Sequence, residues 1–240
     1  MKLTFLGTRG EIEARTTAHG MHTSLLVAYR RRRVMIDCGQ DWLGKIDAVN
    51  PHAIVITHAH PDHAWGLAQG APCPVYATEM AWQDLSAYPI EERHTLAEQT
   101  PSPIEGITFT AFPVEHSTRC PAVAYRIGAG HACILYAPDV VYIHQREEAF
   151  ERVQLYIGDG ATLDQSFVRK RGDHLIGHTP VRTQLTWCQK AGVGEAIITH
   201  CGSQIVEDDT EVVYQQVNAW GQARGVKVSI AYDGMERLLR

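Results

Sequence analysis

Long apolar runs are missing from this sequence of 240 residues. The longest unbroken one, Ala132–Ala137, is far too short to cross a bilayer, so no membrane association is expected. The amino-terminal segment lacks the long apolar core of a signal peptide, and no export is indicated. Low-complexity linkers and short-period repeats are also absent, which favours a single domain over residues 1–240.

An excess of positive charge is missing as well. The chain has 22 Lys and Arg residues against 27 Asp and Glu residues, a net charge of −5. Proteins that bind nucleic acid usually carry a basic surface, so this balance does not support a nucleic-acid partner. It leaves a small anionic substrate open, because metal ions can supply positive charge locally. The four consecutive arginines Arg30–Arg33 lie between two strand-like segments, and we interpret them as a solvated hairpin turn.

Paired cysteines are missing too. The six cysteines are scattered and form no C-x-x-C pair. This pattern is typical of free thiols in a reducing compartment and favours a cytoplasmic protein. Histidine, in contrast, is abundant, with 13 residues, and the chemistry is therefore sought among the histidines.

Short apolar segments bounded by turn-forming residues recur along the chain and are typical of strands. They are Leu3–Leu6, Ser24–Ala28, Val34–Asp37, Ala53–Thr57, Val75–Ala77, Ile107–Phe112, Ala122–Ile127, Ala132–Tyr136, Val153–Ile157, Ala196–Thr199, Val226–Ile230 and Met235–Leu238. Helical periodicity is clearest over Pro180–Ala191, with Thr179 as the expected N-cap, and over Asp209–Arg224. Shorter helices are expected to begin at His63, Met80 and Val140. Two groups of strands with interspersed helices predict two sheets packed face to face with helices outside.

Three histidines and an aspartate follow directly after one apolar strand. They form the sequence His58-Ala59-His60-Pro61-Asp62-His63. Neutral imidazole and carboxylate groups are the ligands that suit zinc and related divalent metals. Side chains alternate in extended backbone, so His58 and His60 are expected to point the same way and to bind one ion. Asp62 and His63 lie just beyond and are expected to reach a neighbouring ion.

Three more side chains of the metal-binding type stand at strand ends. His116 follows Phe112–Glu115, Asp139 follows an apolar strand and Pro138, and His200 follows Ala196–Thr199. Each is a weak signal alone. Loops at one edge of a scaffold converge on one site, however, and four strands that each deliver such a ligand therefore predict a shared metal centre.

These residues resemble the metallo-β-lactamase superfamily of metallohydrolases, over essentially the whole chain. The resemblance implies an α/β fold, an αββα four-layer sandwich with two divalent metal ions at one edge. Zinc is the expected metal, and manganese or iron can occupy similar sites. The resemblance assigns a first ion to His58, His60 and His116, and a second ion to Asp62, His63 and His200, with Asp139 between the two. It places Asp37 behind these ligands, as a group that orients them.

Two positions narrow the expected activity within the family. The antibiotic-degrading β-lactamases have cysteine or no bridging carboxylate at the position of Asp139, so antibiotic degradation is not expected. The segment Gly177–Pro180 places His178 just before a helix and 22 residues before His200. This arrangement is similar to the ribonuclease Z and PhnP-type phosphodiesterase branch, in which the equivalent histidine assists phosphoester cleavage. A helix start favours anions, and a histidine there can protonate a departing oxygen.

The resemblance therefore implies a phosphodiesterase in which a hydroxide shared by two ions attacks phosphorus. Asp62 and His178 are the expected catalytic residues. Only 23 positions separate His116 from Asp139, which leaves little room for the tRNA-gripping arm of ribonuclease Z. A small phosphodiester or nucleotide-like substrate is therefore expected, and a homodimer is common in the family.

Several alternatives remain open from the sequence. The same centre suits hydrolysis of carboxylic esters, thioesters or lactones, and a ribonuclease Z-like RNA endonuclease is a further candidate. A non-enzymatic metal-binding scaffold would bind tightly without turnover. The loop Arg9–Arg15 and the pair His19 and His22 receive no function from the sequence.

Overall fold

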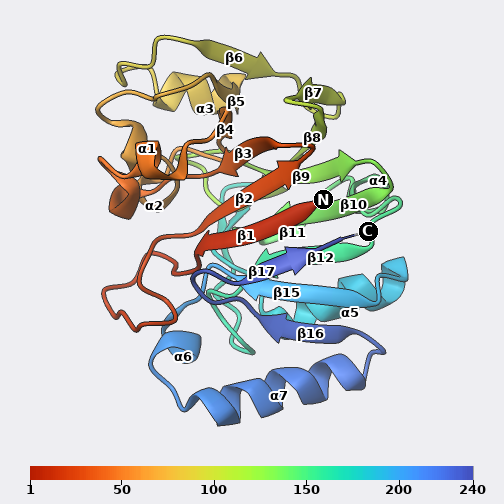
Figure 1. Ribbon diagram of the computed structural model, residues 1–240. Coiled ribbons are helices and arrows are strands. Elements are labelled where there is room, and N and C mark those ends of the chain that lie inside the picture. Colours follow the sequence, from red (N-terminus) through yellow and green to blue (C-terminus); the bar gives the residue numbers. More distant parts are fainter. Residues whose placement is uncertain (240) are drawn as a thin grey trace.

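The computed structural model describes residues 1–239, in which two large β-sheets pack face to face (Figure 1). The first sheet has the strand order β17-β1-β2-β3-β4-β5-β6. Its strands are β1 (Lys2–Gly7), β2 (Ser24–Tyr29), β3 (Arg32–Ile36), β4 (Ala53–Val55), β5 (Val75–Thr78), β6 (Arg93–Leu96) and β17 (Glu236–Leu238). The first and last strands pair, so the two ends of the chain lie side by side.

The second sheet has the order β11-β8-β9-β10-β12-β15-β16, and β7 pairs with β8. Its strands are β7 (Ser102–Ile104), β8 (Ile107–Glu115), β9 (Ala122–Ala129), β10 (Ala132–Ala137), β11 (Tyr142–Ile143), β12 (Leu155–Asp159), β15 (Glu195–Thr199) and β16 (Lys227–Ile230). A separate hairpin is formed by β13 (Arg169–Arg171) and β14 (His174–Ile176).

Helices cover the outer faces of both sheets (Figure 1). The α-helices are α1 (Ile46–Val49), α2 (Pro61–Ala64), α3 (Glu79–Asp84), α4 (Arg146–Ala149), α5 (Val181–Ala191), α6 (Ser203–Val206) and α7 (Thr210–Gln222), with short 3-10 turns η1 (Gln40–Trp42) and η2 (Trp65–Leu67). None of the helices within residues 1–239 has the length and apolar character needed to span a membrane.

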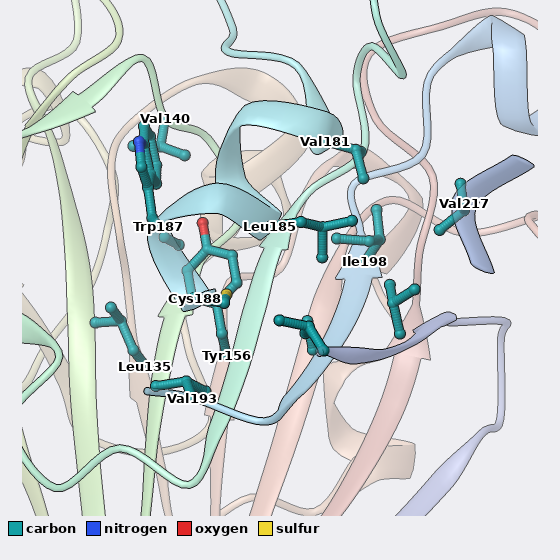
Figure 2. Close-up of a cluster of buried hydrophobic side chains, with 14 of the residues drawn as sticks. Leu135, Val140, Tyr156, Val181, Leu185, Trp187, Cys188, Val193, Ile198 and Val217 are labelled. Carbon is teal, nitrogen blue, oxygen red and sulfur yellow. The ribbon is translucent and has the colours of Figure 1, made fainter. Parts of the chain in front are cut away.

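Three apolar layers hold the sheets and helices together. Side chains alternate between the two faces of a strand, so β10 contributes to two of these layers. Ile134 and Tyr136 point into the layer between the sheets, whereas Leu135 and Ala137 point into the layer beneath α5 and α7. Figure 2 shows that second layer, where Leu185 of α5 packs among the strand side chains. The observed layers confirm the predicted four-layer α/β sandwich.

The strand directions bring several strand ends to one edge. In the first sheet, β3 and β4 run parallel. In the second sheet, β10, β12 and β15 also run parallel, with Asp159 paired in register with Thr199. The long strand β8 is antiparallel to β9, which is antiparallel to β10, so β8 ends at the same edge. The residues that follow these strands are therefore neighbours.

Some local predictions were wrong. No helix begins at Val140: the backbone N–H of Val141 bonds to the carbonyl of Glu115, and the chain continues as strand β11 beside β8. The N-cap of α5 is Pro180 rather than Thr179, because the Pro180 carbonyl accepts the first hydrogen bonds of the helix, from the N–H groups of Thr183 and Gln184. The arginine run does form a turn, since Arg30 and Arg31 have positive φ between β2 and β3.

Candidate metal centre

Three imidazoles meet at the first part of the centre. Nε2 of His58 lies 2.9 Å from Nδ1 of His60, and Nε2 of His116 lies 3.2 Å from the same Nδ1. Three nitrogens on a tetrahedral zinc ion lie about 3.3 Å apart, given zinc–nitrogen bonds of about 2.0–2.1 Å. The spacing of the three rings therefore suits one ion. His58 and His60 follow the end of β4 rather than lying in the strand, so a loop and not strand alternation brings them together.

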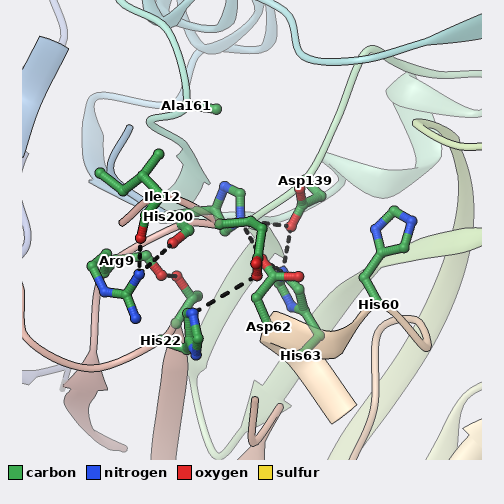
Figure 3. Close-up of polar contacts among 12 residues, drawn as sticks. Arg9, Ile12, His22, His60, Asp62, His63, Asp139, Ala161 and His200 are labelled. Carbon is green, nitrogen blue, oxygen red and sulfur yellow. Dashed lines mark hydrogen bonds and ion pairs between the residues drawn. The ribbon is translucent and has the colours of Figure 1, made fainter. Parts of the chain in front are cut away.

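Asp62, His63 and His200 form the second part. Oδ2 of Asp62 lies 3.1 Å from Nε2 of His200 and 3.3 Å from Nε2 of His63. Asp62 and His63 lie in the short helix α2, and His200 comes directly after β15, with a φ of 50° that is rare for a residue with a side chain. All three side chains are buried. Figure 3 shows the contacts among them.

Asp139 lies between the two groups. Its Oδ2 is 2.7 Å from Nε2 of His63, and its Oδ1 is 3.6 Å from Nε2 of His116. One carboxylate oxygen thus faces each group, which is the placement that a bridging ligand needs. The structure brings all seven predicted ligands together, and their coordination of metal stays a prediction.

Burial and charge divide the imidazoles into two classes. At the first group, burial lowers the pKa of His58 well below its ordinary value and that of His60 to about 4, so both rings are neutral and able to bind metal. At the second group, burial also acts to lower the pKa, but the carboxylates of Asp62 and Asp139 raise that of His63 well above its ordinary value. Positive charge is therefore favoured there.

The residues present fit a bound cation. Nε2 of His63 and Oδ2 of Asp139 are buried and have no aligned hydrogen-bond partner among residues 1–239, although the two atoms lie close together. A buried polar atom without a partner costs about 1–3 kcal/mol. Coordination of an ion by both atoms removes that cost and supplies the charge that the carboxylates favour. His/Asp sites of this composition are typical of zinc and related divalent metals.

Asp37 contacts His63, one of the predicted ligands, from behind, as the resemblance implied. It is fully buried; Oδ1 accepts a hydrogen bond of 2.8 Å from the Thr57 N–H, and Oδ2 lies 2.8 Å from both Thr57 Oγ1 and His63 Nδ1. A histidine that donates its Nδ1–H in this way presents Nε2 to a metal. The backbone is equally close-fitting here: a Cβ on Gly39 would lie 1.9 Å from the carbonyl oxygen of Asp62.

His178 lies at the edge of the cluster and is held by a residue that the sequence reasoning missed. Its Nδ1 lies 2.8 Å from Oδ2 of Asp159. Asp159 is fully buried and also accepts hydrogen bonds from the N–H groups of Val140 and Ala161. Burial opposes the charged form of His178, but the Asp159 carboxylate raises its pKa above the ordinary value. Asp159 is the last residue of the apolar strand β12, a signal similar to the one that identified His200 just after β15.

The segments that received no function from the sequence surround the centre. Arg9 is buried and pairs with Asp41 at 2.6 Å, and Asp41 also lies 3.0 Å from Nδ1 of His22. His19 Nδ1 lies 2.8 Å from the hydroxyl of Thr8. These contacts fix the loop after β1 against the fold, so His19 and His22 have structural partners outside the seven predicted ligands.

An αββα sandwich with a His/Asp cluster at its strand ends is the architecture of a metal-dependent hydrolase of the metallo-β-lactamase fold. The family model described as the beta-lactamase superfamily domain matches residues 32–201, and the chain belongs to this family. No curated protein sequence matches the chain.

Solved structures share the fold at low identity. The metallo-β-lactamase-fold protein YhfI from Bacillus subtilis is 17% identical over 98% of each chain, with a TM-score of 0.74. A diphosphatase from the PhnP family is 18% identical over 100% of this chain and 98% of its own, with a TM-score of 0.72. The short form of human tRNase Z is 19% identical over the whole of both chains, with a TM-score of 0.62.

Proposed function

We propose that this protein is a phosphodiesterase with two divalent metal ions, zinc in the first instance. The observation that carries the proposal is the pair of His178 and Asp159 beside the metal cluster. Asp159 accepts the hydrogen bond of His178 Nδ1, which leaves Nε2 as the ring nitrogen that can contact a substrate. The ring is 23% exposed and lines the same pocket as the predicted ligands.

The chain's own residues then have distinct tasks. The seven ligands position the ions; when bound, these ions supply positive charge and lower the pKa of water from about 15.7 toward about 7. Asp62 contacts both His63 and His200 and so orients the other two predicted ligands of the second group. His178, as the imidazolium favoured by Asp159, donates a proton to the departing alkoxide oxygen and stabilises charge on the phosphoryl group. A carboxylic ester or lactone is uncharged, so it gains less from the positive charge of an imidazolium than an anionic phosphodiester does.

Two structural neighbours support phosphate chemistry, since one is a diphosphatase and another a tRNase Z. The connection between His116 and Asp139 supports a small substrate rather than tRNA. Strands β9 and β10 occupy residues 122–137 of it, so no protruding arm is present in this connection. A small phosphodiester or nucleotide-like substrate is therefore favoured over RNA.

The test is a substrate panel on metal-replete protein. Bis-p-nitrophenyl phosphate, p-nitrophenyl phosphate, p-nitrophenyl acetate, a lactone and a thioester are compared, with metal content measured in parallel. We expect the diester to be turned over fastest. Because nitrophenolate leaves without a proton donor, the role of His178 is measured on a diester with an alkoxide leaving group, such as a dinucleotide, for which H178A should lower kcat by about 10²-fold or more with unchanged metal content. H131A, which removes an exposed histidine from the β9–β10 turn, is the matched control. Preferred turnover of acetate, lactone or thioester contradicts the proposal.

The ligand set has its own test. D139A removes the residue that faces both groups, so we expect it to lose metal and activity together. Retention of two ions per chain in D139A excludes the bridging role. The cytoplasmic location expected from the sequence is part of the proposal, supported by six cysteines that are all free thiols.

A further inference from the structure

The pocket at the predicted metal centre has a mixed lining. Its volume is about 390 Å³, within the range of small-molecule sites. Predicted metal ligands and His178 contribute one part of the lining, and apolar side chains, among them Ile12, Ala161 and Phe167, contribute another. Neither Lys nor Arg lines it among the described residues, and Glu11 stands at its rim. Positive charge for a substrate thus comes from the metal side alone.

Phe167 is held at this pocket by its backbone. It is 45% exposed, one of few large apolar side chains with such exposure in residues 1–239. Gly177 has a φ of 106°, and a Cβ there would lie 2.1 Å from the Phe167 carbonyl oxygen, so the two segments are in direct contact. The Gly177 N–H bonds in turn to the carbonyl of His116 over 2.8 Å. The backbone that carries the aromatic side chain is therefore held next to His116, one of the predicted ligands.

The loop that leads to Phe167 is anchored at its start as well. The Leu163 N–H donates to Oε1 of Gln204 over 2.9 Å, and the Ala161 N–H donates to Asp159 over 2.8 Å. Asp159 is the same residue that holds His178. The loop and the proposed proton donor thus share one support.

Ile12 is fixed from a different part of the chain. Its carbonyl accepts a hydrogen bond from the buried guanidinium of Arg9, which also pairs with Asp41 at 2.6 Å (Figure 3). Ile12 is partly buried and packs against the apolar layer between the second sheet and the helices α5 and α7. Ile12 and Phe167 thus come from separate segments whose backbones are held by polar contacts, and both line the pocket beside the predicted metal ligands; we call these two side chains the apolar wall.

We propose that Ile12 and Phe167 form a subsite for a planar ring carried by the substrate, which has a single phosphate group. This assignment rests on the proposed function, whose phosphodiester would place one ester group against the wall. The wall offers a ring face and no charge for a second phosphate, and the Glu11 carboxylate repels one. Stacking of a planar ring on an aromatic side chain is sequence-tolerant and strong enough to change binding about tenfold.

The test measures binding rather than turnover, so that it is independent of catalysis. Calorimetric titration of metal-replete protein compares phenylphosphonate with methylphosphonate, and AMP with ribose 5-phosphate. Each pair has the same metal-binding group with and without a ring. The first pair tests a simple aryl group and the second a nucleobase. The proteins are wild type, F167A, F167Y and Y232A; Tyr232 is 49% exposed and lies outside the pocket lining.

We expect the ring-bearing ligand of at least one pair to bind wild type about tenfold more tightly than its partner. The preference should fall to about twofold or less in F167A and persist in F167Y and Y232A. Equal binding within both pairs in wild type, or a preference that F167A leaves unchanged, overturns the subsite. If the preference is found but no diester is hydrolysed, the subsite stands and the proposed function fails. If a diester is hydrolysed without the preference, the proposed function stands and the subsite fails.

Discussion

Nδ1 of His178 lies 2.8 Å from Oδ2 of the buried Asp159, and this pair sets the orientation of the proposed proton donor. Val140 donates to Oδ2 of Asp159 and Ala161 to Oδ1, so D159N keeps an acceptor oxygen for only one of these N–H groups, and it removes the charge that favours the imidazolium. We expect kcat for a diester to fall by about 10²-fold, with KM and metal content little changed.

The pH profile and a double mutant separate this role from a merely structural one. In D159N the basic limb of kcat should move to lower pH, because the pKa of His178 falls when the carboxylate charge is removed. D159N combined with H178A should be little slower than H178A alone, since both changes remove one function. Fully additive losses contradict the pairing.

Asp37 supports the second group, and D37N tests how much its charge matters. Asparagine tolerates the positive φ of 59° at this position and can still accept from the Thr57 N–H. The charge opposite Nδ1 of His63 is lost, so we expect metal affinity to fall by about 10–100-fold. Competition with a chromophoric chelator gives the affinity, and the exposed Asp47 supplies a control, D47N, which should bind as wild type does.

Gly39 makes the close approach on which the position of Asp62 depends. G39A places a Cβ 1.9 Å from the Asp62 carbonyl oxygen, so the backbone must move. Overpacking of this kind costs about 1–3 kcal/mol or more of the free energy of unfolding. We expect a lower Tm and weaker metal binding. G194A is the control, because its Cβ meets nothing within 4 Å; equal effects of the two changes rule out a specific role for Gly39.

His22 makes the folded state sensitive to acid. Burial, aided by the charge of Arg9, lowers the pKa of His22 to about 4 from its ordinary value of 6.5. Below about pH 6.5 the unfolded chain therefore takes up a proton that the folded chain does not, and the free energy of unfolding falls as the pH drops toward about 4. We expect this contribution to reach about 1–3 kcal/mol.

The variant H22Q removes that titration. Urea unfolding of metal-free wild type and H22Q at pH 7 and pH 4.5 gives the two losses of stability, and the loss should be smaller in the variant. Metal-free protein is used because the predicted ligands also take up protons when metal leaves. An identical loss in both proteins means that His22 contributes nothing to the acid sensitivity.

Most of the site residues that the sequence could predict lie at the ends of strands. His116 and His200 each follow an apolar strand, and parallel strands deliver such residues to one edge. Asp159 is the last residue of β12 and obeys the same rule, but no sequence motif marks it.

Apolar patterns in the sequence do not predict loops or polar strands. The strands β13 and β14 are mostly exposed, so Arg169–Arg171 shows no apolar alternation to identify a strand. Phe167 and Ile12 lie in irregular segments. The segment before Phe167 is held by Gln204, which is distant in the sequence, and Ile12 is held by Arg9, which belongs to no recognisable motif. Tertiary contacts, rather than local propensity, decide where such residues lie.

The central claim is that this chain hydrolyses a phosphodiester with two metal ions held by the seven clustered side chains. Stepwise addition of zinc to metal-free protein, with bound metal and hydrolysis of bis-p-nitrophenyl phosphate followed together, tests it most directly. We predict that activity rises with metal and reaches its plateau at two ions per chain. Two bound ions without diester hydrolysis, or full activity in the presence of excess chelator, contradict the claim.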